Sequence, residues 1–340
     1  MSKILVTGGL GYIGSHTVVE LINNGYEVVI VDNLSNSSIE VLDRLEQLTG
    51  KKINFEKIDL RDKEKVSKLF KTYSEINGVI HFAASKSVSE SVENPLKYYE
   101  NNIAALVYLM DAMIETNVNN FIFSSSCTVY GQAEEMPITE NTPIQKAMSP
   151  YGNSKKIGEE IIEDTCKVTS LKSVLLRYFN PIGAHESSLI GELPVGVPQN
   201  LVPFITQTAA GIREELLVYG VNYPTTDGSA VRDYIHVVDL AKAHVVALNR
   251  LLKDENETKV EVFNLGTGKG NTVLEVIDAF EKVAERRLPF RVVGRREGDI
   301  TIAYANTEKA NEVLKWKAEK DIEESILSAW NWEKKIRNIN

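Results

Sequence analysis

A tyrosine and a lysine four residues apart, Tyr151 and Lys155, form the pair of side chains in this sequence best suited to acid–base chemistry. On a helix this spacing places the phenol and the ammonium on one face. A tyrosine with an ordinary pKa of about 10 is a poor base near neutral pH, but a neighbouring ammonium favours its phenolate. Ser126, at the end of a predicted strand, would hydrogen-bond the same substrate oxygen. Because Tyr–Lys pairs also occur on ordinary helix surfaces, the interpretation depends on the surrounding elements.

A glycine-rich segment, residues 7–14, lies directly between the first predicted strand and the first predicted helix. Gly8, Gly11 and Gly14 would let the backbone approach a pyrophosphate at a helix N-terminus. Asp32 ends the next predicted strand, where a carboxylate accepts hydrogen bonds from an adenosine ribose and repels a 2′-phosphate. The segment therefore predicts a site for NAD rather than NADP. The alternative is a tight structural turn beside a surface aspartate.

Short β-branched segments alternate with amphipathic segments through the first half of the chain. This rhythm predicts strands at 4–6, 28–31, 53–58, 79–82, 121–124 and 174–177, and helices at 14–24, 39–49, 63–73, 95–117 and 151–168. Continuous apolar strands separated by helices indicate a sheet covered on both faces. The predicted fold is α/β, a Rossmann-type doubly wound parallel sheet, and Ser126 and Asp32 follow strands at its ligand-binding edge.

The rhythm breaks after residue 180, where glycines and prolines predict a loop over 180–200. Residues 262–264 offer one more strand for the sheet. We therefore expect an NAD-binding Rossmann domain formed by 1–180 together with about 234–265. A smaller, interleaved C-terminal α/β domain, formed by 181–233 and 266–340, would bind the substrate.

Composition excludes several classes of function. With 38 Lys and Arg against 47 Asp and Glu, the formal net charge is −9, so we expect no nucleic-acid or membrane-surface partner. Cys127 and Cys166 are the only cysteines, which is compatible with a reducing cytoplasm, and no cluster has metal-ligand spacing. Because the first predicted strand begins at residue 4, we expect no leader sequence. No apolar run in the sequence is long enough to span a membrane. We predict a cytoplasmic enzyme without a metal.

The order of the motifs resembles the extended short-chain dehydrogenase/reductase family, and within it the UDP-hexose 4-epimerases. The motifs that carry the resemblance are TGGLGYIG at 7–14, DNLSN at 32–36, HFAA at 81–84, FSSSCTVYG at 123–131, YGNSK at 151–155, RYFNP at 177–181, YPTTDG at 223–228, VRDYIHV at 231–237 and GRREGD at 294–299.

The resemblance implies three groups of site residues. Catalysis would involve Ser126, Tyr151 and Lys155. The NAD cofactor would contact Gly8, Gly11, Tyr12, Ile13, Gly14, Asp32, Asn33, Asn36, Ser37, Asp59, Leu60, Phe82, Ala83, Ala84, Lys86, Asn101, Ser124, Tyr151, Lys155 and Phe179. The UDP-sugar would contact Ser126, Tyr151, Asn180, Asn200, Leu201, Tyr219, Arg232, Arg296, Asp299 and Ala303. The arginines also suit a diphosphate on chemical grounds, although Arg295-Arg296 alone reads as a solvated basic turn. His81 and His236 are expected to be packed or hydrogen-bonded rather than catalytic.

The reaction predicted by the resemblance is 4-epimerisation of UDP-glucose and UDP-galactose, by hydride transfer to NAD and back through a 4-keto sugar. Dehydratases of this fold carry Thr-Asp-Glu where this sequence has Ser126-Cys127-Thr128, so elimination of water lacks its carboxylates. The alternatives are another nucleotide-sugar enzyme, such as a dehydratase or a UDP-glucuronate epimerase, or a non-catalytic NAD-binding regulator. A free-sugar or steroid dehydrogenase would need neither Arg232 nor Arg296.

Two finer expectations also come from the resemblance. Some members carry a tyrosine shortly after the Gly298-Asp299 motif that blocks a 2-N-acetyl group, and Ala303 stands at that position here. UDP-N-acetylhexosamines are therefore expected substrates as well, unless Tyr304 fills the space. The family is usually dimeric through two helices, here the predicted helices 95–117 and 151–168, so a homodimer is expected.

Overall fold

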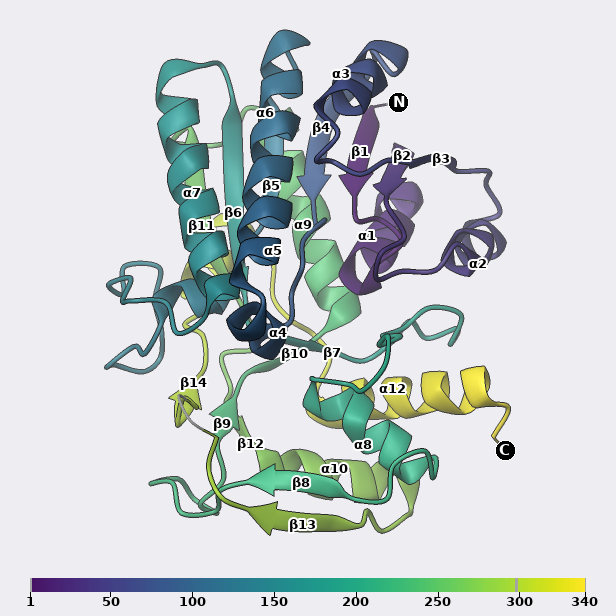
Figure 1. Ribbon diagram of the computed structural model, residues 1–340, viewed down its shortest axis with the longest axis vertical. Coiled ribbons are helices and arrows are strands. Elements are labelled where there is room, and N and C mark those ends of the chain that lie inside the picture. The colour runs from purple at the N-terminus through teal and green to yellow at the C-terminus, as the bar shows by residue number, and fades with distance from the viewer. Residues whose placement is uncertain (1, 297–298, 340) are drawn as a thin grey trace. The chain divides into compact units, whose positions relative to one another are not determined.

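The computed structural model describes residues 2–296 and 299–339 and divides into two compact units (Figure 1). Unit 1 is formed by Met1–Gln132, Pro143–Tyr178 and Ala241–Phe263, and unit 2 by Ala133–Thr142, Phe179–Leu240 and Asn264–Asn340. Residues 133–142 belong to unit 2 because Ile138 forms a β-bridge with Ala305. Residues 234–240 belong there because Tyr234–His236 pairs with Asn180–Ile182. Gly298, named above with Asp299, lies outside the described residues.

Unit 1 contains a seven-stranded sheet in the order β11-β6-β5-β4-β1-β2-β3, and its paired strands run parallel. The strands are β1 (Lys3–Thr7), β2 (Glu27–Asp32), β3 (Asn54–Lys57), β4 (Ile76–His81), β5 (Asn120–Ser124), β6 (Lys172–Tyr178) and β11 (Val260–Leu265). The central strands are buried along nearly their whole length, because helices cover both faces of the sheet. Their parallel direction brings the carboxyl ends of β5, β4, β1 and β2 to one edge.

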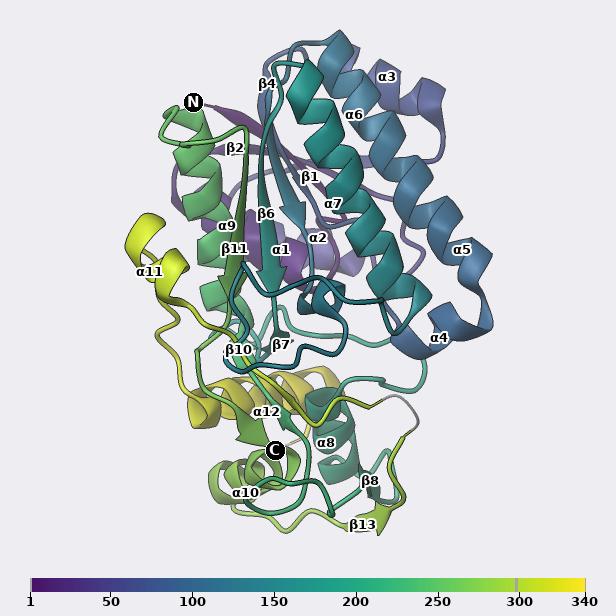
Figure 2. The ribbon, with the colours of Figure 1, turned by 90° about the vertical axis from the view of Figure 1, so that its left-hand side faces the viewer.

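The longer helices of unit 1 pack apolar side chains against the sheet. They are α1 (Tyr12–Asn23), α2 (Glu40–Thr49), α3 (Lys63–Thr72), α4 (Val88–Glu93), α5 (Pro95–Tyr99), α6 (Ala105–Glu115), α7 (Pro150–Val168) and α9 (Val237–Leu252), with a 3₁₀ turn at Cys127–Tyr130. Helices α3, α6 and α7 share one apolar core with β1, β4 and β5, and Figure 2 shows α9 on the opposite side of the strands. The sheet is therefore doubly wound, and the predicted fold class is confirmed.

The predicted helix over 95–117 contains a feature that periodicity does not reveal. Between α5 and α6 the chain forms a π-helical turn, Glu100–Ala104. The turn places the buried Asn102 amide where it donates to Ser154 Oγ of α7 at 2.9 Å. A widened turn of this kind often marks a functional position in a helix.

Unit 2 is built from short strands and amphipathic helices. Its strands are β7 (Asn180–Ile182), β8 (Leu216–Tyr219), β9 (Val231–Arg232), β10 (Tyr234–His236), β12 (Asn271–Thr272), β13 (Phe290–Val293) and β14 (Ile302–Ala303). Its helices are α8 (Leu201–Ala209), α10 (Val273–Ala284), α11 (Glu308–Val313) and α12 (Ile322–Arg337). The strands form three small sheets, β10-β7, β12-β9-β14 and β13-β8. Helices α8, α10 and α12 enclose the apolar core, and capping boxes fix where α10 and α12 begin.

Candidate active site

The glycine-rich loop between β1 and α1 has a backbone path that side chains would obstruct. Gly8 has φ +69°, and a Cβ there would lie 2.8 Å from the Ala83 amide nitrogen. A Cβ on Gly14 would lie 2.2 Å from the Gly8 carbonyl oxygen, so only glycine fits where the loop meets the helix. No side chain caps the start of α1, whose N-cap residue is Gly11. This is the geometry of a helix N-terminus that faces a phosphate.

Asp32 ends β2 with its side chain directed into this loop. Its Oδ2 accepts a hydrogen bond from the Leu10 amide at 3.2 Å, and its Oδ1 accepts from the Leu34 amide at 3.0 Å and from Ser37 Oγ at 2.8 Å. A carboxylate has about four acceptor positions, so three internal bonds leave capacity for a ribose hydroxyl. The buried negative charge would repel a 2′-phosphate. The loop and Asp32 together fit the pyrophosphate and adenosine ribose of NAD.

The rest of the predicted adenosine site follows β2 and β3. Asn33 Nδ2 donates to Asp59 Oδ2 at 3.4 Å. Leu60, the residue after Asp59, is buried. Hydrogen bonds from Arg61 lower the pKa of Asp59 to about 2, so this carboxylate is ionised. Asn36 is exposed in the loop after β2.

The segment after β4, which contains the predicted contacts Phe82, Ala83, Ala84 and Lys86, is fastened to β1. The Phe82 amide donates to the Thr7 carbonyl at 3.0 Å, and His81 shares a 2.7 Å hydrogen bond with Thr7 Oγ1. Burial lowers the pKa of His81 to about 3, so its ring is neutral. His81 is thus packed and hydrogen-bonded, as expected. Asn101 lies in the π-helical turn, where its amide donates to Asn102 Oδ1 at 3.1 Å.

The catalytic candidates converge at the carboxyl end of β5. Helix α7 begins at Pro150, where Ser149 Oγ accepts the Gly152 amide at 3.1 Å, and this cap places Tyr151 in the first turn. One turn later, Lys155 Nζ donates to the Ser124 carbonyl at 2.7 Å and lies over the Phe123 ring. Tyr151 is 8% exposed and Lys155 4%, so this is a buried, preorganised group rather than a helix-surface pattern.

The ionisation of Tyr151 differs from the simplest expectation. Burial strongly raises the pKa of its phenol, and a hydrogen bond with Ser126 only partly opposes this rise. The Lys155 ammonium is directed at the Ser124 carbonyl. With its pKa raised by burial, the phenol is protonated near neutral pH. The positive charge of a bound nicotinamide would favour its phenolate.

Sequence reasoning missed a second phenol in this group. Tyr178, at the end of β6, shares a 2.8 Å hydrogen bond with Ser124 Oγ, and burial raises its pKa to about 12. Ser124 thus bonds Tyr178 through its hydroxyl and Lys155 through its carbonyl. The sequence indicates this residue only by its position, because Tyr178 directly follows Arg177 at the end of a predicted strand.

In unit 2, Arg232 forms the centre of the predicted diphosphate site. Its Nη2 pairs with Asp299 Oδ1 at 2.6 Å, and its Nη1 donates to the Val231 carbonyl at 2.8 Å. The Asp299 and Arg232 side chains remain 22% and 20% exposed, so the pair is accessible to a competing anion. A guanidinium group can bind two oxygens of a diphosphate at once, so Arg232 suits this ligand.

Two adjacent arginines near Asp299 are ordered by tyrosines. The Arg296 guanidinium lies 3.8 Å from the centre of the Tyr219 ring, and Arg295 lies 3.9 Å from that of Tyr223. Cation–π contacts of this kind hold guanidinium groups in place without consuming their hydrogen-bond donors. Arg295 and Arg296 are thus exposed to solvent, but each guanidinium is held against a tyrosine ring.

The remaining predicted substrate contacts also lie in unit 2, as does the predicted cofactor contact Phe179. Asn180 begins β7, and Asn200 immediately precedes α8, which begins at Leu201. The Asn200 amide donates to Glu192 at 2.8 Å. Ala303 is paired in register with Arg232 and is 8% exposed.

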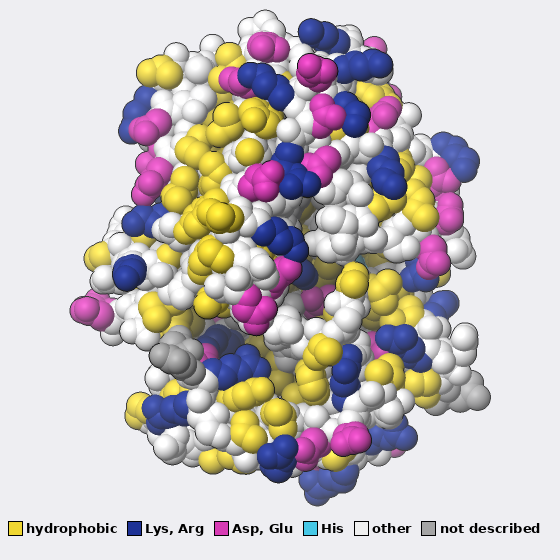
Figure 3. Space-filling model, in the orientation of Figure 1, with side chains coloured by type: hydrophobic (Ala, Val, Ile, Leu, Met, Phe, Trp, Pro, Cys, Tyr) yellow, Lys and Arg dark blue, Asp and Glu magenta, His cyan; other side chains and the backbone are white. Residues whose placement is uncertain are grey.

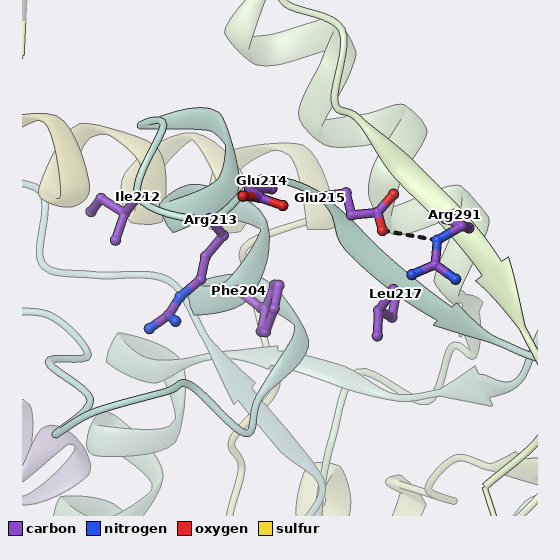
Figure 4. Close-up of a pocket in the computed structure, with 7 residues that line it drawn as sticks. All are labelled: Phe204, Ile212, Arg213, Glu214, Glu215, Leu217 and Arg291. Carbon is purple, nitrogen blue, oxygen red and sulfur yellow. Dashed lines mark hydrogen bonds and ion pairs between the residues drawn. The ribbon is translucent and has the colours of Figure 1, made fainter.

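A hollow of about 350 Å³ in unit 2 contains none of these residues (Figure 4). Its lining is Phe204, Ile212, Arg213, Glu214, Glu215, Leu217 and Arg291. Arg291 is neutralised by Glu215 at 2.8 Å, so we assign the hollow no part in the reaction. Among residues 2–296 and 299–339, no group of three metal-ligating side chains could hold a metal ion.

The sequence is 51% identical to the UDP-glucose 4-epimerase of Bacillus subtilis over 99% of this chain and 98% of that protein. This chain belongs to the UDP-glucose 4-epimerase family. The crystal structure of a family member from Stenotrophomonas maltophila, with bound NAD and formylated UDP-arabinopyranose, matches with a TM-score of 0.96 at 44% identity and covers both chains completely.

Residues 5–328 also match the family model described as GDP-mannose 4,6 dehydratase. A further relative, the bifunctional protein GAL10 of Pachysolen tannophilus, is 52% identical over 98% of this chain. The chain spans about half of that longer protein, 49% of its length. The resemblance found from the motifs is therefore confirmed for the UDP-glucose 4-epimerase family.

Proposed function

We propose that this chain is a NAD-dependent 4-epimerase that interconverts UDP-glucose and UDP-galactose. The observation that carries the proposal is the buried group of Tyr151, Lys155 and Ser126 at the carboxyl end of β5, in the same unit as the glycine-rich loop and Asp32. NAD, when bound there, supplies a hydride acceptor for carbon 4 of the sugar and later returns the hydride.

Each side chain of the group has a defined task. Tyr151 takes the proton from the 4-hydroxyl as the sugar is oxidised and gives it back on reduction. Lys155 contributes positive charge that favours the phenolate, and Ser126 holds the same sugar oxygen by a hydrogen bond. Burial excludes water and strengthens each of these interactions.

Epimerisation requires that the sugar turn its other face to the hydride donor while the nucleotide stays bound. Arg232, Arg296 and Asp299 of unit 2 would hold the UDP portion, which leaves the hexose free to rotate. Arg232 exchanges one anion, the Asp299 carboxylate at 2.6 Å, for another, the diphosphate. This exchange limits the electrostatic cost of emptying and refilling the site.

Dehydration is the main alternative within the fold. It needs acidic and basic side chains near carbons 5 and 6, whereas Ser126 is followed by Cys127 and Thr128 in the 3₁₀ turn. Neither side chain is a carboxylate, which favours epimerisation. The test is incubation of the purified protein with UDP-galactose, UDP-GlcNAc and UDP-glucuronate in separate reactions, followed by product identification. Formation of UDP-glucose supports the proposal, whereas a 4-keto-6-deoxy product or a reaction with UDP-glucuronate alone contradicts it.

We extend the proposal to UDP-N-acetylglucosamine and UDP-N-acetylgalactosamine. Ala303 presents only a methyl group, and Tyr304 directly follows the strand β14 that contains it. The Tyr304 ring lies near Gly270, where an added Cβ would be 3.5 Å from Tyr304 Cδ1. Because the Tyr304 ring packs at Gly270, we expect that it does not replace the missing ring.

We also propose a homodimer formed through the helices of unit 1. Figures 1 and 2 show α6 and α7 side by side, and Figure 3 shows hydrophobic side chains gathered over them. Val107 and Ile114, seven residues apart on α6, are each 38% exposed, and Leu96 of α5 is 81% exposed. An exposed apolar helix face is typical of a buried interface between subunits. Light scattering should give the dimer mass, and Val107→Glu should shift the protein to monomer; a monomeric wild type would refute the proposal.

A cytoplasmic location is our last proposal, and it is compatible with Cys127 and Cys166, neither of which forms a disulfide. No helix among the described residues has the length and apolar character needed to cross a bilayer. Cell fractionation with an antibody to this protein tests the location, and recovery outside the cytoplasmic fraction would refute it.

A further inference from the structure

A buried ion pair lies directly behind the catalytic group. Arg177 of β6 binds both carboxylate oxygens of Glu159 on α7, with Nη2 2.6 Å from Oε2 and Nε 3.0 Å from Oε1. The Arg177 and Glu159 side chains are only 5% and 3% exposed. Tyr130 accepts from Arg177 Nη1 at 3.0 Å, and Ser125 Oγ donates to Glu159 Oε1. The reaction proposed above uses none of these residues.

The pair is linked to Lys155 by the geometry of α7 and β5. Tyr151, Lys155 and Glu159 follow one another at four-residue intervals, so they line one face of α7. That face meets consecutive residues of β5 and its continuation, because Lys155 binds the Ser124 carbonyl and Glu159 binds the Ser125 hydroxyl.

Helix α7 packs closely on β5 at this point. Gly158 lies between the two charged residues, and a Cβ there would be 3.0 Å from Phe123 Cζ. The carboxylate of Glu159, one helical turn after Lys155, is held in place by its bonds to Arg177 and Ser125. A role in stability alone would not require charged residues at these positions, since well-packed apolar residues stabilise a core at least as well as a buried ion pair.

We propose that Glu159 and Arg177 are positioning residues for catalysis, which hold Lys155 charged and directed at the Ser124 carbonyl. The negative charge of Glu159 stabilises the Lys155 ammonium. The positive charge of Arg177 partly cancels that stabilisation. This assignment rests on the proposed function, because it gives the pair its purpose in the 4-epimerase reaction.

The electrostatics of the surroundings agree with this assignment. Burial lowers the pKa of Lys155 to about 8, and Glu159 opposes the shift, so the ammonium titrates close to the working pH of most enzymes. The other titratable side chains that face this region are His81 from β4, Tyr151 from α7, Arg177 and Tyr178 from β6, and Tyr130 and Cys127 from the 3₁₀ turn. Burial keeps His81, Tyr151 and Tyr178 neutral, and Arg177 is paired with Glu159. Glu159 is thus the nearby negative charge that supports Lys155 among the described residues.

The test measures the pKa of Lys155 directly in Glu159→Gln, Arg177→Gln and the double variant. Lysine labelled with ¹³C at the ε carbon is followed by NMR against pH in the NAD-loaded protein, and Lys155→Met assigns the resonance. Glu159→Gln should lower the pKa by about one unit, and Arg177→Gln should raise it by a similar amount. The basic limb of kcat/KM for UDP-galactose should move with the lysine in each variant.

A matched control separates charge from packing. Arg250 and Glu261 form a comparable buried pair elsewhere in unit 1, with Nε 2.7 Å from Oε2. Glu261→Gln breaks that pair and should leave the pKa of Lys155 unchanged.

The double variant leaves no unpaired charge, so it keeps the test valid if a single variant does not fold. Its Lys155 pKa should still fall, by less than in Glu159→Gln, because Glu159 is the residue that shares a face with Lys155. Shifts of the same sign in both single variants, or an unchanged pKa in the folded double variant, would overturn the proposal. Shifts as expected in a protein that does not convert UDP-galactose would overturn the proposed reaction instead.

Discussion

The two units hold their functional residues in contrasting ways. In unit 1, Tyr151 and Lys155 are 8% and 4% exposed, and Lys155 is hydrogen-bonded to the end of β5. In unit 2, the Arg232 and Asp299 side chains are about one-fifth exposed and are paired with each other at 2.6 Å. The sheet fixes the Tyr151–Lys155 group in place. In the other group, Asp299 occupies Arg232 and can be displaced by another anion.

This difference matches two physical requirements. Proton and hydride transfer need a constant geometry and little water, which a buried sheet edge provides. A site for the nucleotide part of the substrate must bind and release an anion. Accessible arginines whose carboxylate partner can be displaced allow this. The contrast predicts that substitutions of the catalytic group in unit 1 change the turnover number, whereas substitutions of Arg232 in unit 2 change the apparent affinity for the substrate.

The largest effect should follow Tyr151→Phe. Without the phenolic hydroxyl no side chain takes the proton from the 4-hydroxyl, so kcat should fall about 10³-fold while UDP binding is unchanged. Steady-state kinetics and calorimetric titration with UDP measure the two quantities. Tyr178→Phe is the matched control, because it removes a second buried phenolic hydroxyl, the one bonded to Ser124. It should lower kcat far less. Equal losses in both variants would contradict the assigned role.

Arg232→Met should mainly weaken substrate binding. Loss of the charged donors should raise KM for UDP-galactose by about ten- to a hundred-fold, because a charge-assisted hydrogen bond contributes about 1.5–3 kcal/mol. The turnover number should change little. Arg291→Met, which removes another ion-paired arginine of unit 2, should leave both constants near the wild-type values. If Arg232→Met instead lowered kcat alone, the division of labour between the units would be wrong.

Asp32→Asn should relax the choice of cofactor. Removing the negative charge lowers the repulsion of a 2′-phosphate. The one remaining side-chain oxygen can still accept from the Leu10 amide or the Leu34 amide, which bond to different oxygens of Asp32. The preference for NAD over NADP should fall about tenfold. Competition binding to cofactor-stripped protein measures the ratio, and an unchanged ratio would remove Asp32 from this role.

The smallest effect on UDP-galactose should come from Ala303→Tyr. The new ring should abolish turnover of UDP-N-acetylgalactosamine and leave that of UDP-galactose within about threefold, since a steric block rejects only the bulkier substrate. Tyr304→Ala should not change the ratio of the two rates, because that ring is directed toward Gly270. Retained activity of Ala303→Tyr on the N-acetyl substrate would refute the gate.

Much of unit 1 could be predicted from sequence, because its elements are set by local patterns. Apolar runs gave the strands, and the glycines and Asp32 gave the cofactor loop. The π-helical turn was not predictable, since Glu100–Ala104 has ordinary helical composition and its shape depends on tertiary contacts such as Asn102 with Ser154.

The buried partners of the catalytic group were also beyond sequence reasoning. Glu159 and Arg177 lie 18 residues apart and meet only after α7 packs on the sheet. The protonated state of Tyr151 depends on burial, which the Tyr151–Lys155 spacing does not reveal. In unit 2, the pairing of Arg232 with Asp299 joins residues 67 positions apart in short strands and loops, where periodicity gives little signal.

The most direct test of the central claim follows the hydrogen on carbon 4. UDP-galactose carrying deuterium at that carbon is incubated with the purified protein in ordinary water, and the UDP-glucose formed is analysed by NMR. The account predicts full retention of deuterium at carbon 4, with no net reduction of NAD, because the same hydride is removed and returned within the site. Loss of deuterium to solvent, or accumulation of reduced cofactor in proportion to product, would contradict it.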